Sequence, residues 1–199
     1  MKKILIIITA FLITAKLNAQ QNFVYGRAGF SLFLGDAKKR DVYSIFPALT
    51  ISPGFRILPL GSDLSISLDF PLSIGFSFFD DDADDDDGLG FDAPATVNLN
   101  FGLGASRRSA SNFGMSFGTG VVYHASPTWG YDSGNPGTAR NLNMSGYIFQ
   151  AGFYFPESKK DPVEDRIGFG LRLSYASNFK EDPVRKYVAS IGLIVFGDF

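Results

Sequence analysis

The longest regular pattern in the chain runs from Leu64 to Phe78, where apolar and polar positions alternate without interruption. Leu, Ile and Phe occupy the even positions, while Ser, Gly, Pro and a single Asp occupy the odd ones. Because successive side chains of a strand point to opposite faces, this period of two predicts a β-strand. The polar face is small and carries one charge, Asp69. A large apolar face opposite a narrow polar one is typical of a transmembrane β-barrel, whose outer face meets lipid.

Seven further segments show the same alternation. They are Val24–Leu34, Leu49–Leu58, Ala95–Ala105, Phe113–Tyr123, Tyr147–Phe155, Ile167–Tyr175 and Tyr187–Phe199. The last segment has the weakest pattern, since Val188, Ile194 and Phe196 interrupt its polar face. A tilted strand needs roughly 9–11 residues to cross a bilayer, and bacterial barrels have an even number of strands. We therefore predict an all-β fold, an eight-stranded antiparallel transmembrane β-barrel. The alternative is a soluble lipocalin-like barrel, in which the two faces are reversed.

The segments that join the predicted strands also alternate in character. The first, third, fifth and seventh links are residues 35–48, 79–94, 124–146 and 176–186. The second, fourth and sixth are residues 59–63, 106–112 and 156–166. The first set is mostly longer, although the sixth link is long for a turn. Outer-membrane barrels have long extracellular loops and short periplasmic turns, so the longer links are predicted to be extracellular.

Charged residues well inside the predicted strands all fall on the inward face. They are Arg27, Arg56, Asp69 and Arg172. A charge that faces lipid at mid-depth costs about 2–4 kcal/mol, so this placement supports the assignment of the faces. Arg27, Asp69 and Arg172 are expected at similar depth. We predict a structural polar cluster in the lumen, in which the two arginines share one carboxylate, because buried charges need partners. The alternative interpretation is a narrow ion pore.

The first 19 residues have the features of a secretory signal peptide. Lys2 and Lys3 precede an apolar run, and a small residue stands at position 19. Residues 20–199 are then the barrel domain. Without Lys2, Lys3 and Lys16, 15 basic residues face 20 acidic ones, a net charge of −5 that argues against nucleic acid as a partner. The chain has no Cys, which excludes disulfides and thiolate metal sites.

The chain resembles the small eight-stranded outer-membrane barrels of the OmpX and OmpA transmembrane type. The features that carry this resemblance are the signal peptide, the strand count, the link lengths and the terminal Phe199. The resemblance covers the whole mature chain. It implies an outer-membrane location in a Gram-negative bacterium, contact with outer-membrane lipid and lipopolysaccharide, and recognition by the barrel-insertion machinery through Phe199. It carries over no catalytic residues and no cofactor. We expect a monomeric, non-enzymatic protein with a structural or surface-interaction role through its extracellular loops.

Seven aspartates gather within Asp80–Asp87, in the second long link. Carboxylate oxygens are the ligands that Ca²⁺ prefers, which favours weak binding of divalent cations. The spacing does not match an EF-hand loop, however. With Gly88 as the sixth position, Ala83 and Pro94 stand where the first and last ligands belong. A solvated loop, extended by its own charge, is the simpler prediction.

The sole histidine belongs to the sequence His124-Ala125-Ser126, at the end of the fifth predicted strand. This sequence resembles the His-x-Ser of outer-membrane lipid A deacylases, where Ser is the nucleophile and His its base. Pro127 departs from that family's pattern, and Asp132 is the nearest acid that follows. Alternation also places His124 on the inward face, away from lipid. A lipid A-modifying hydrolase that uses His124 and Ser126 therefore stays an alternative function.

Overall fold

The computed structural model describes residues 24–37, 42–76, 88–106, 109–126, 129–130, 142–156, 167–179 and 186–198. The predicted signal peptide 1–19, the acidic run Asp80–Asp87, Asp132 and the terminal Phe199 lie outside these residues. Within the described part of the chain, no helix has the length and apolar character that a membrane crossing requires.

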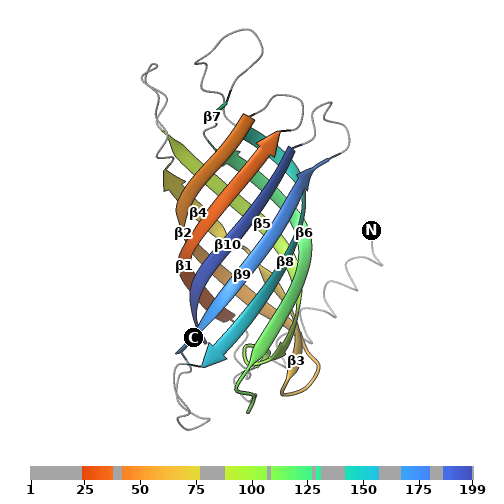
Figure 1. The fold of residues 1–199 in the computed structure, drawn as a ribbon. Helices are drawn as coiled ribbons and strands as arrows, with labels where there is room; N and C mark the ends of the chain where they lie inside the picture. The colour runs from red at the N-terminus through yellow and green to blue at the C-terminus, as the bar shows by residue number, and fades with distance from the viewer. Residues whose placement is uncertain are drawn as a thin grey trace, which may run out of the picture.

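The described residues form a closed antiparallel barrel (Figure 1). Its strands are β1 (Val24–Ala37), β2 (Val42–Pro59), β3 (Leu64–Asp69), β4 (Leu72–Phe76), β5 (Leu89–Gly102), β6 (Gly114–Ser126), β7 (Trp129–Gly130), β8 (Leu142–Pro156), β9 (Ile167–Asn178) and β10 (Lys186–Asp198). Strand β1 pairs with both β10 and β2, and this closes the ring. Because β3 and β4 share one position and the short β7 adds only to β2, the ring has eight positions. The predicted fold is confirmed.

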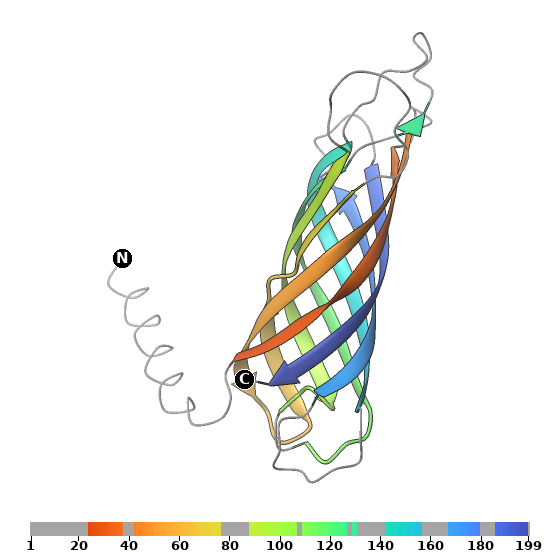
Figure 2. The ribbon, with the colours of Figure 1, turned by 90° about the vertical axis from the view of Figure 1, so that its left-hand side faces the viewer.

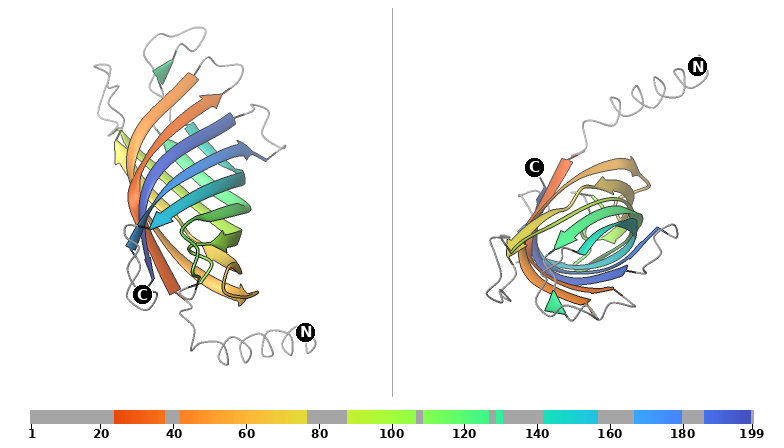
Figure 3. Two further views of the ribbon diagram at one scale, coloured as in Figure 1. Left: turned by 60° about the horizontal axis from the view of Figure 1, so that its bottom comes forward. Right: turned by 90° about the horizontal axis from the view of Figure 1, so that it is seen from above.

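Closure leaves the wall of the barrel without an unpaired edge. Seen from above, the strands form a continuous outline (Figure 3). Strand β1 begins and β10 ends at one end of the barrel, and β7 lies at the opposite end (Figure 2). The first end also holds the short turn of residues 60–63 between β2 and β3. Short turns are periplasmic in this architecture, so we name this end periplasmic and the end with β7 extracellular.

The described part of the predicted strand, Leu64–Phe76, is two strands rather than one uninterrupted strand. The break falls at Phe70 and Pro71, since Pro lacks the N–H that a ladder requires. Phe70 N–H instead donates to the carbonyl of Pro53 at 3.0 Å. Both strands pair with β2 and β5, and the alternation survives the break: Asp69, Pro71 and Ser73 are all buried.

Several strands reach further toward the extracellular end than predicted. β2 begins at Val42 instead of Leu49, and β8 begins at Leu142 instead of Tyr147. The residues 35–48, 79–94 and 124–146 that were assigned to links thus contain parts of strands. In these extensions apolar residues such as Phe46 and Met144 also face inward. The contrast between the two faces is therefore weaker where the strands continue.

The outer face of the barrel is apolar, as predicted. Phe30 and Leu193 are each 69% exposed, and large apolar side chains of this kind occur on all eight ring positions. Most polar side chains of the same strands face inward and are buried, among them Arg27, Asp69 and Arg172. This arrangement suits a hydrocarbon surrounding and would be unfavourable in water.

Candidate functional site

Side chains fill the interior of the barrel in three layers. The lower cluster, toward the periplasmic end, contains the buried apolar residues Leu103, Tyr154, Ile194 and Phe196. The upper cluster, toward the extracellular end, contains Phe33, Phe46, Ala48, Val122, Leu142, Met144, Ile148, Ala176 and Val188. Polar side chains lie between the two clusters and beside them. An eight-stranded barrel is just wide enough for such filling.

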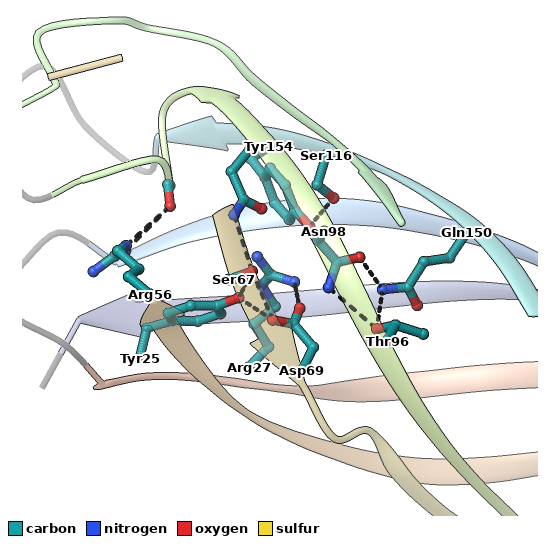
Figure 4. Close-up of polar contacts among 12 residues, drawn as sticks. Tyr25, Arg27, Arg56, Ser67, Asp69, Thr96, Asn98, Ser116, Gln150 and Tyr154 are labelled. Atoms are coloured by element: carbon teal, nitrogen blue, oxygen red, sulfur yellow. Dashed lines mark hydrogen bonds and ion pairs between the residues drawn. The ribbon is translucent and has the colours of Figure 1, made fainter. Parts of the chain in front are cut away.

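A buried ion pair lies in the periplasmic half. Arg27 on β1 and Asp69 on β3 approach to 2.7 Å between Nη1 and Oδ2, and both are buried (Figure 4). The other carboxylate oxygen accepts hydrogen bonds from the hydroxyls of Tyr25 and Ser67, the latter at 2.9 Å. Every oxygen of Asp69 is thus used. A buried carboxylate requires this saturation, because desolvation costs several kcal/mol per ion, on the order of what the pairing returns.

Aromatic rings surround the arginines of this half. The Arg27 guanidinium carbon lies 4.7 Å from the ring centroids of both Tyr25 and Tyr154. The guanidinium of Arg56 lies 4.8 Å from the Tyr25 ring, and its Nη2 donates to the Gly104 carbonyl at 3.1 Å. Cation–π contacts of this kind stabilise cations that have lost their water. Two arginines therefore share one tyrosine ring, an arrangement that the strand pattern gave no means to predict.

Arg172 on β9 is buried on the inward face, but it does not join Asp69. Its Nη2 lies 3.5 Å from Ser31 Oγ, and within the described residues the ion pair of Asp69 is with Arg27. Gly152 and Gly192 are its partners on the two neighbouring strands, which leaves room for the long side chain. The predicted sharing of one carboxylate thus extends to Arg27 alone. A structural role for the cluster stays a prediction.

Hydrogen bonds between amides and hydroxyls occupy the middle of the barrel. Gln150 Nε2 donates to Thr96 Oγ1 at 3.0 Å and to Asn98 Oδ1 at 2.5 Å (Figure 4). On the opposite wall, Thr50 Oγ1 lies 2.8 Å from both Ser31 Oγ and Ser73 Oγ. These contacts link side chains from five strands, so they fix the shape of the interior as well as satisfying its polar groups.

A second polar group lies at the extracellular end, among the aromatic rings of the upper cluster. His124 on β6 has Nδ1 2.9 Å from Asp92 Oδ1 and Nε2 3.0 Å from Ser126 Oγ. Ser126 Oγ also lies 2.6 Å from Ser44 Oγ on β2. The rings of Phe33 and Phe46 stack on each other, and His124 is tilted against both, at centroid distances of 5.8 and 5.5 Å.

The acid of this group is one that sequence reasoning missed. Asp92 is the direct cross-strand partner of His124, whereas Asp132 lies outside the described residues. The signal that could have revealed Asp92 is its place in the strand alternation, since it continues the inward row of Thr96 and Asn98. Pro94 and the preceding acidic run suggested a link there instead. The predicted inward direction of His124 is confirmed: it is 1% exposed.

Among the described residues, no three His, Asp or Glu side chains come together as possible ligands. The cation site predicted for Asp80–Asp87 lies outside the described residues.

Comparisons with known proteins identify the fold. No family model and no curated protein matches the chain. Neisserial surface protein A superposes with a TM-score of 0.50 at 15% identity, over 88% of this chain and 97% of its own. The attachment invasion locus protein Ail of Yersinia pestis gives 0.49 at 10% identity, over 88% and 99%. The N-terminal β-barrel domain of OprF from Pseudomonas aeruginosa gives 0.47 at 12% identity, over 88% and 98%.

The likeness to Neisserial surface protein A shows the fold. The chain has the architecture of the small eight-stranded outer-membrane barrels, and the resemblance predicted from the sequence is confirmed. This closed fold and the apolar outer face together place the protein in the outer membrane of a Gram-negative bacterium.

Proposed function

We propose that this outer-membrane barrel is closed to ions and acts at the cell surface, through the segments that join its strands at the extracellular end. The observation that carries the proposal is the filled interior. Its polar middle has an apolar cluster on either side. An ion that passed along the lumen would have to leave its water to cross both clusters, and hydrophobic constrictions oppose this.

A surface role follows from which surfaces of the barrel are already occupied. The outer face of the strands is committed to lipid, and the inner face is committed to packing. Phe46 in the upper cluster is 0% exposed and stacks on Phe33 at 4.7 Å. What is left for contact with other molecules is the two ends of the barrel. Loops held by a rigid scaffold commonly carry the function of such proteins.

Conductance in planar lipid bilayers tests the closed interior. We expect the wild-type barrel to be silent. A variant with Phe46→Ala and Met144→Ala in the upper cluster and Ile194→Ala and Phe196→Ala in the lower cluster should conduct, because it removes bulk from both. The variant Ile45→Ala is the matched control, since Ile45 neighbours Phe46 but faces outward. A steady wild-type conductance that changes with Asp69→Ala would overturn this proposal and favour the narrow pore.

The partners expected from the sequence stay predictions. Outer-membrane lipid and lipopolysaccharide are the expected surroundings, Phe199 the expected signal for insertion, and a monomer the expected state.

Replacing the seven aspartates of Asp80–Asp87 by Asn tests the cation prediction. Calcium titration followed by calorimetry should give a weak signal, with a Kd of about 10⁻⁴–10⁻³ M as in extracellular sites, that the variant lacks. Equal signals from both proteins would contradict it.

A further inference from the structure

We propose that Ser126 is a nucleophile, with His124 as its base and Asp92 orienting that base, and that the extracellular end of the barrel hydrolyses small carboxylic esters. This goes beyond the proposed surface role, and it would replace the sequence prediction of a non-enzymatic protein. It stands on the two contacts of His124, at 2.9 Å to Asp92 and 3.0 Å to Ser126. Neither contact depends on a segment outside the described residues.

The partners of the two ring nitrogens of His124 determine where the protons lie. An ionised carboxylate only accepts hydrogen bonds, so Nδ1 of His124 carries the proton and donates it to Asp92 Oδ1. Nε2 is then an acceptor, and it accepts the hydroxyl proton of Ser126. These are the roles of acid, base and nucleophile in a serine hydrolase, with each ring nitrogen facing the correct partner.

The surroundings hold the imidazole in place. Asp92 and His124 face each other across β5 and β6, and the rings of Phe33 and Phe46 pack against His124. The imidazole is 1% exposed. The imidazole is therefore held with one ring nitrogen toward Asp92 and the other toward Ser126.

The reaction has two steps. Ser126 Oγ attacks the ester carbonyl carbon while its proton moves to His124 Nε2, and the hydroxyl of Ser44, 2.6 Å from Ser126 Oγ, is the nearest donor for the oxyanion that forms. The bond from the carbonyl carbon to the alkoxide oxygen then breaks, and His124 returns its proton to the leaving alcohol. A water that His124 deprotonates attacks the acyl-serine, which releases a carboxylic acid and restores Ser126.

The direction of Ser126 selects the class of substrate. Ser126 is the last residue of β6, it faces the lumen and it is 1% exposed. A lipid chain in the membrane lies on the other side of the wall, which distinguishes this proposal from the lipid A hydrolase. The substrate we infer is a small, water-soluble ester that enters from the extracellular side.

The chemical reactivity of Ser126 distinguishes the proposed nucleophile from a serine with a purely structural role. The same hydrogen bonds connect β2, β5 and β6, so mutations here are expected to affect stability in either case. A serine that only makes structural hydrogen bonds does not react with an organophosphorus reagent, whereas a serine activated by a base does. The folded barrel in detergent micelles should therefore be treated with a small fluorophosphonate and, separately, with p-nitrophenyl acetate.

The expected result is one phosphonyl group on Ser126, located by peptide mapping, and release of nitrophenol that His124→Gln slows by about 10²–10⁴-fold. Asp92→Asn should slow it by up to about 10⁴-fold, and Ser126→Ala should abolish both signals. The matched control is Ser190→Ala, because Ser190 pairs with the hydroxyl of Ser174 at 2.7 Å and with no imidazole. It should react as the wild type does.

Folding is checked by the gel shift of unheated barrel. Should Ser126→Ala fail to fold, the mapped position of the adduct on the wild type decides. An unlabelled folded wild type, or an adduct at any residue other than Ser126, would overturn the proposal and leave the three residues a structural brace.

Discussion

Two buried carboxylates occupy the two halves of this barrel, and their partners differ in kind. Asp69, in the periplasmic half, pairs with Arg27 and also accepts from the hydroxyls of Tyr25 and Ser67. Asp92, in the extracellular half, pairs with the ring of His124. A guanidinium only donates hydrogen bonds, whereas a neutral imidazole has one donor and one acceptor nitrogen.

One lumen thus holds two buried aspartates in different surroundings. The lower carboxylate is saturated by donors that hold it fixed, an arrangement suited to stability. The upper carboxylate contacts an imidazole whose second nitrogen lies 3.0 Å from Ser126 Oγ, the arrangement on which the proposed proton transfer rests. Both are inward positions of ordinary strands, so the neighbours on adjacent strands decide the difference.

The largest expected effect is the loss of the lower pair. Asp69→Ala leaves Arg27 buried without its ion-pair partner, and we expect the free energy of unfolding to fall by about 3–5 kcal/mol. Urea unfolding in phospholipid vesicles, followed by tryptophan fluorescence, measures this. The double variant Arg27→Met with Asp69→Leu should recover part of the loss, because both charges are gone. If Asp69→Ala unfolds at the wild-type urea concentration, the pair contributes nothing to stability.

A smaller effect is expected at the upper pair. His124→Phe keeps a ring against Phe33 and Phe46 but leaves Asp92 without the imidazole, and we expect a loss of about 1–3 kcal/mol in the same assay. The loss should be smaller than for Asp69→Ala, because the Asp92 side chain is 7% exposed and the Asp69 side chain 0%. An equal or larger loss at His124 would contradict the distinction drawn between the two halves.

The smallest effect is expected at a third carboxylate, in the periplasmic turn. Hydroxyls of Ser109, Ser62 and Ser111 donate to Asp63 and hold the pKa of its carboxyl below the usual value. A lowered pKa in the folded state stabilises the fold above the unfolded pKa of about 3.9, and this stabilisation disappears as the pH falls through the folded value.

Urea midpoints of the wild type and Asp63→Asn should therefore differ at pH 6 and converge as the pH falls below about 4. The effect is modest because Asp63 is solvent-exposed. A difference that stays constant over this range would show that the Asp63 charge has no part in it.

Strand alternation was sufficient to predict the inward positions of β1, β3 and β9 in the lower half, since small polar residues share that face and make the period visible. Arg27, Asp69 and Arg172 all lie on the predicted face. The upper half was harder, because Phe46 and other inward residues are apolar and hide the period. Asp92 was missed because Pro94 and the preceding acidic run suggested a link there, and its pairing with His124 depends on the register between β5 and β6. The break at Pro71 follows from the missing N–H, a local feature that a hydropathy pattern does not contain.

The direction of the two faces is the central claim, and β10 tests it best because its inward residues are apolar too. Ile194 is 2% exposed and Val195 is 42% exposed, so hydropathy alone does not tell which one meets lipid. The chain has no native cysteine, so Ile194→Cys and Val195→Cys each give one site for a nitroxide label. In phospholipid vesicles, oxygen dissolved in the bilayer should relax the label at position 195 strongly and the label at position 194 weakly. The reverse order would contradict the membrane barrel and support a soluble barrel with its faces exchanged.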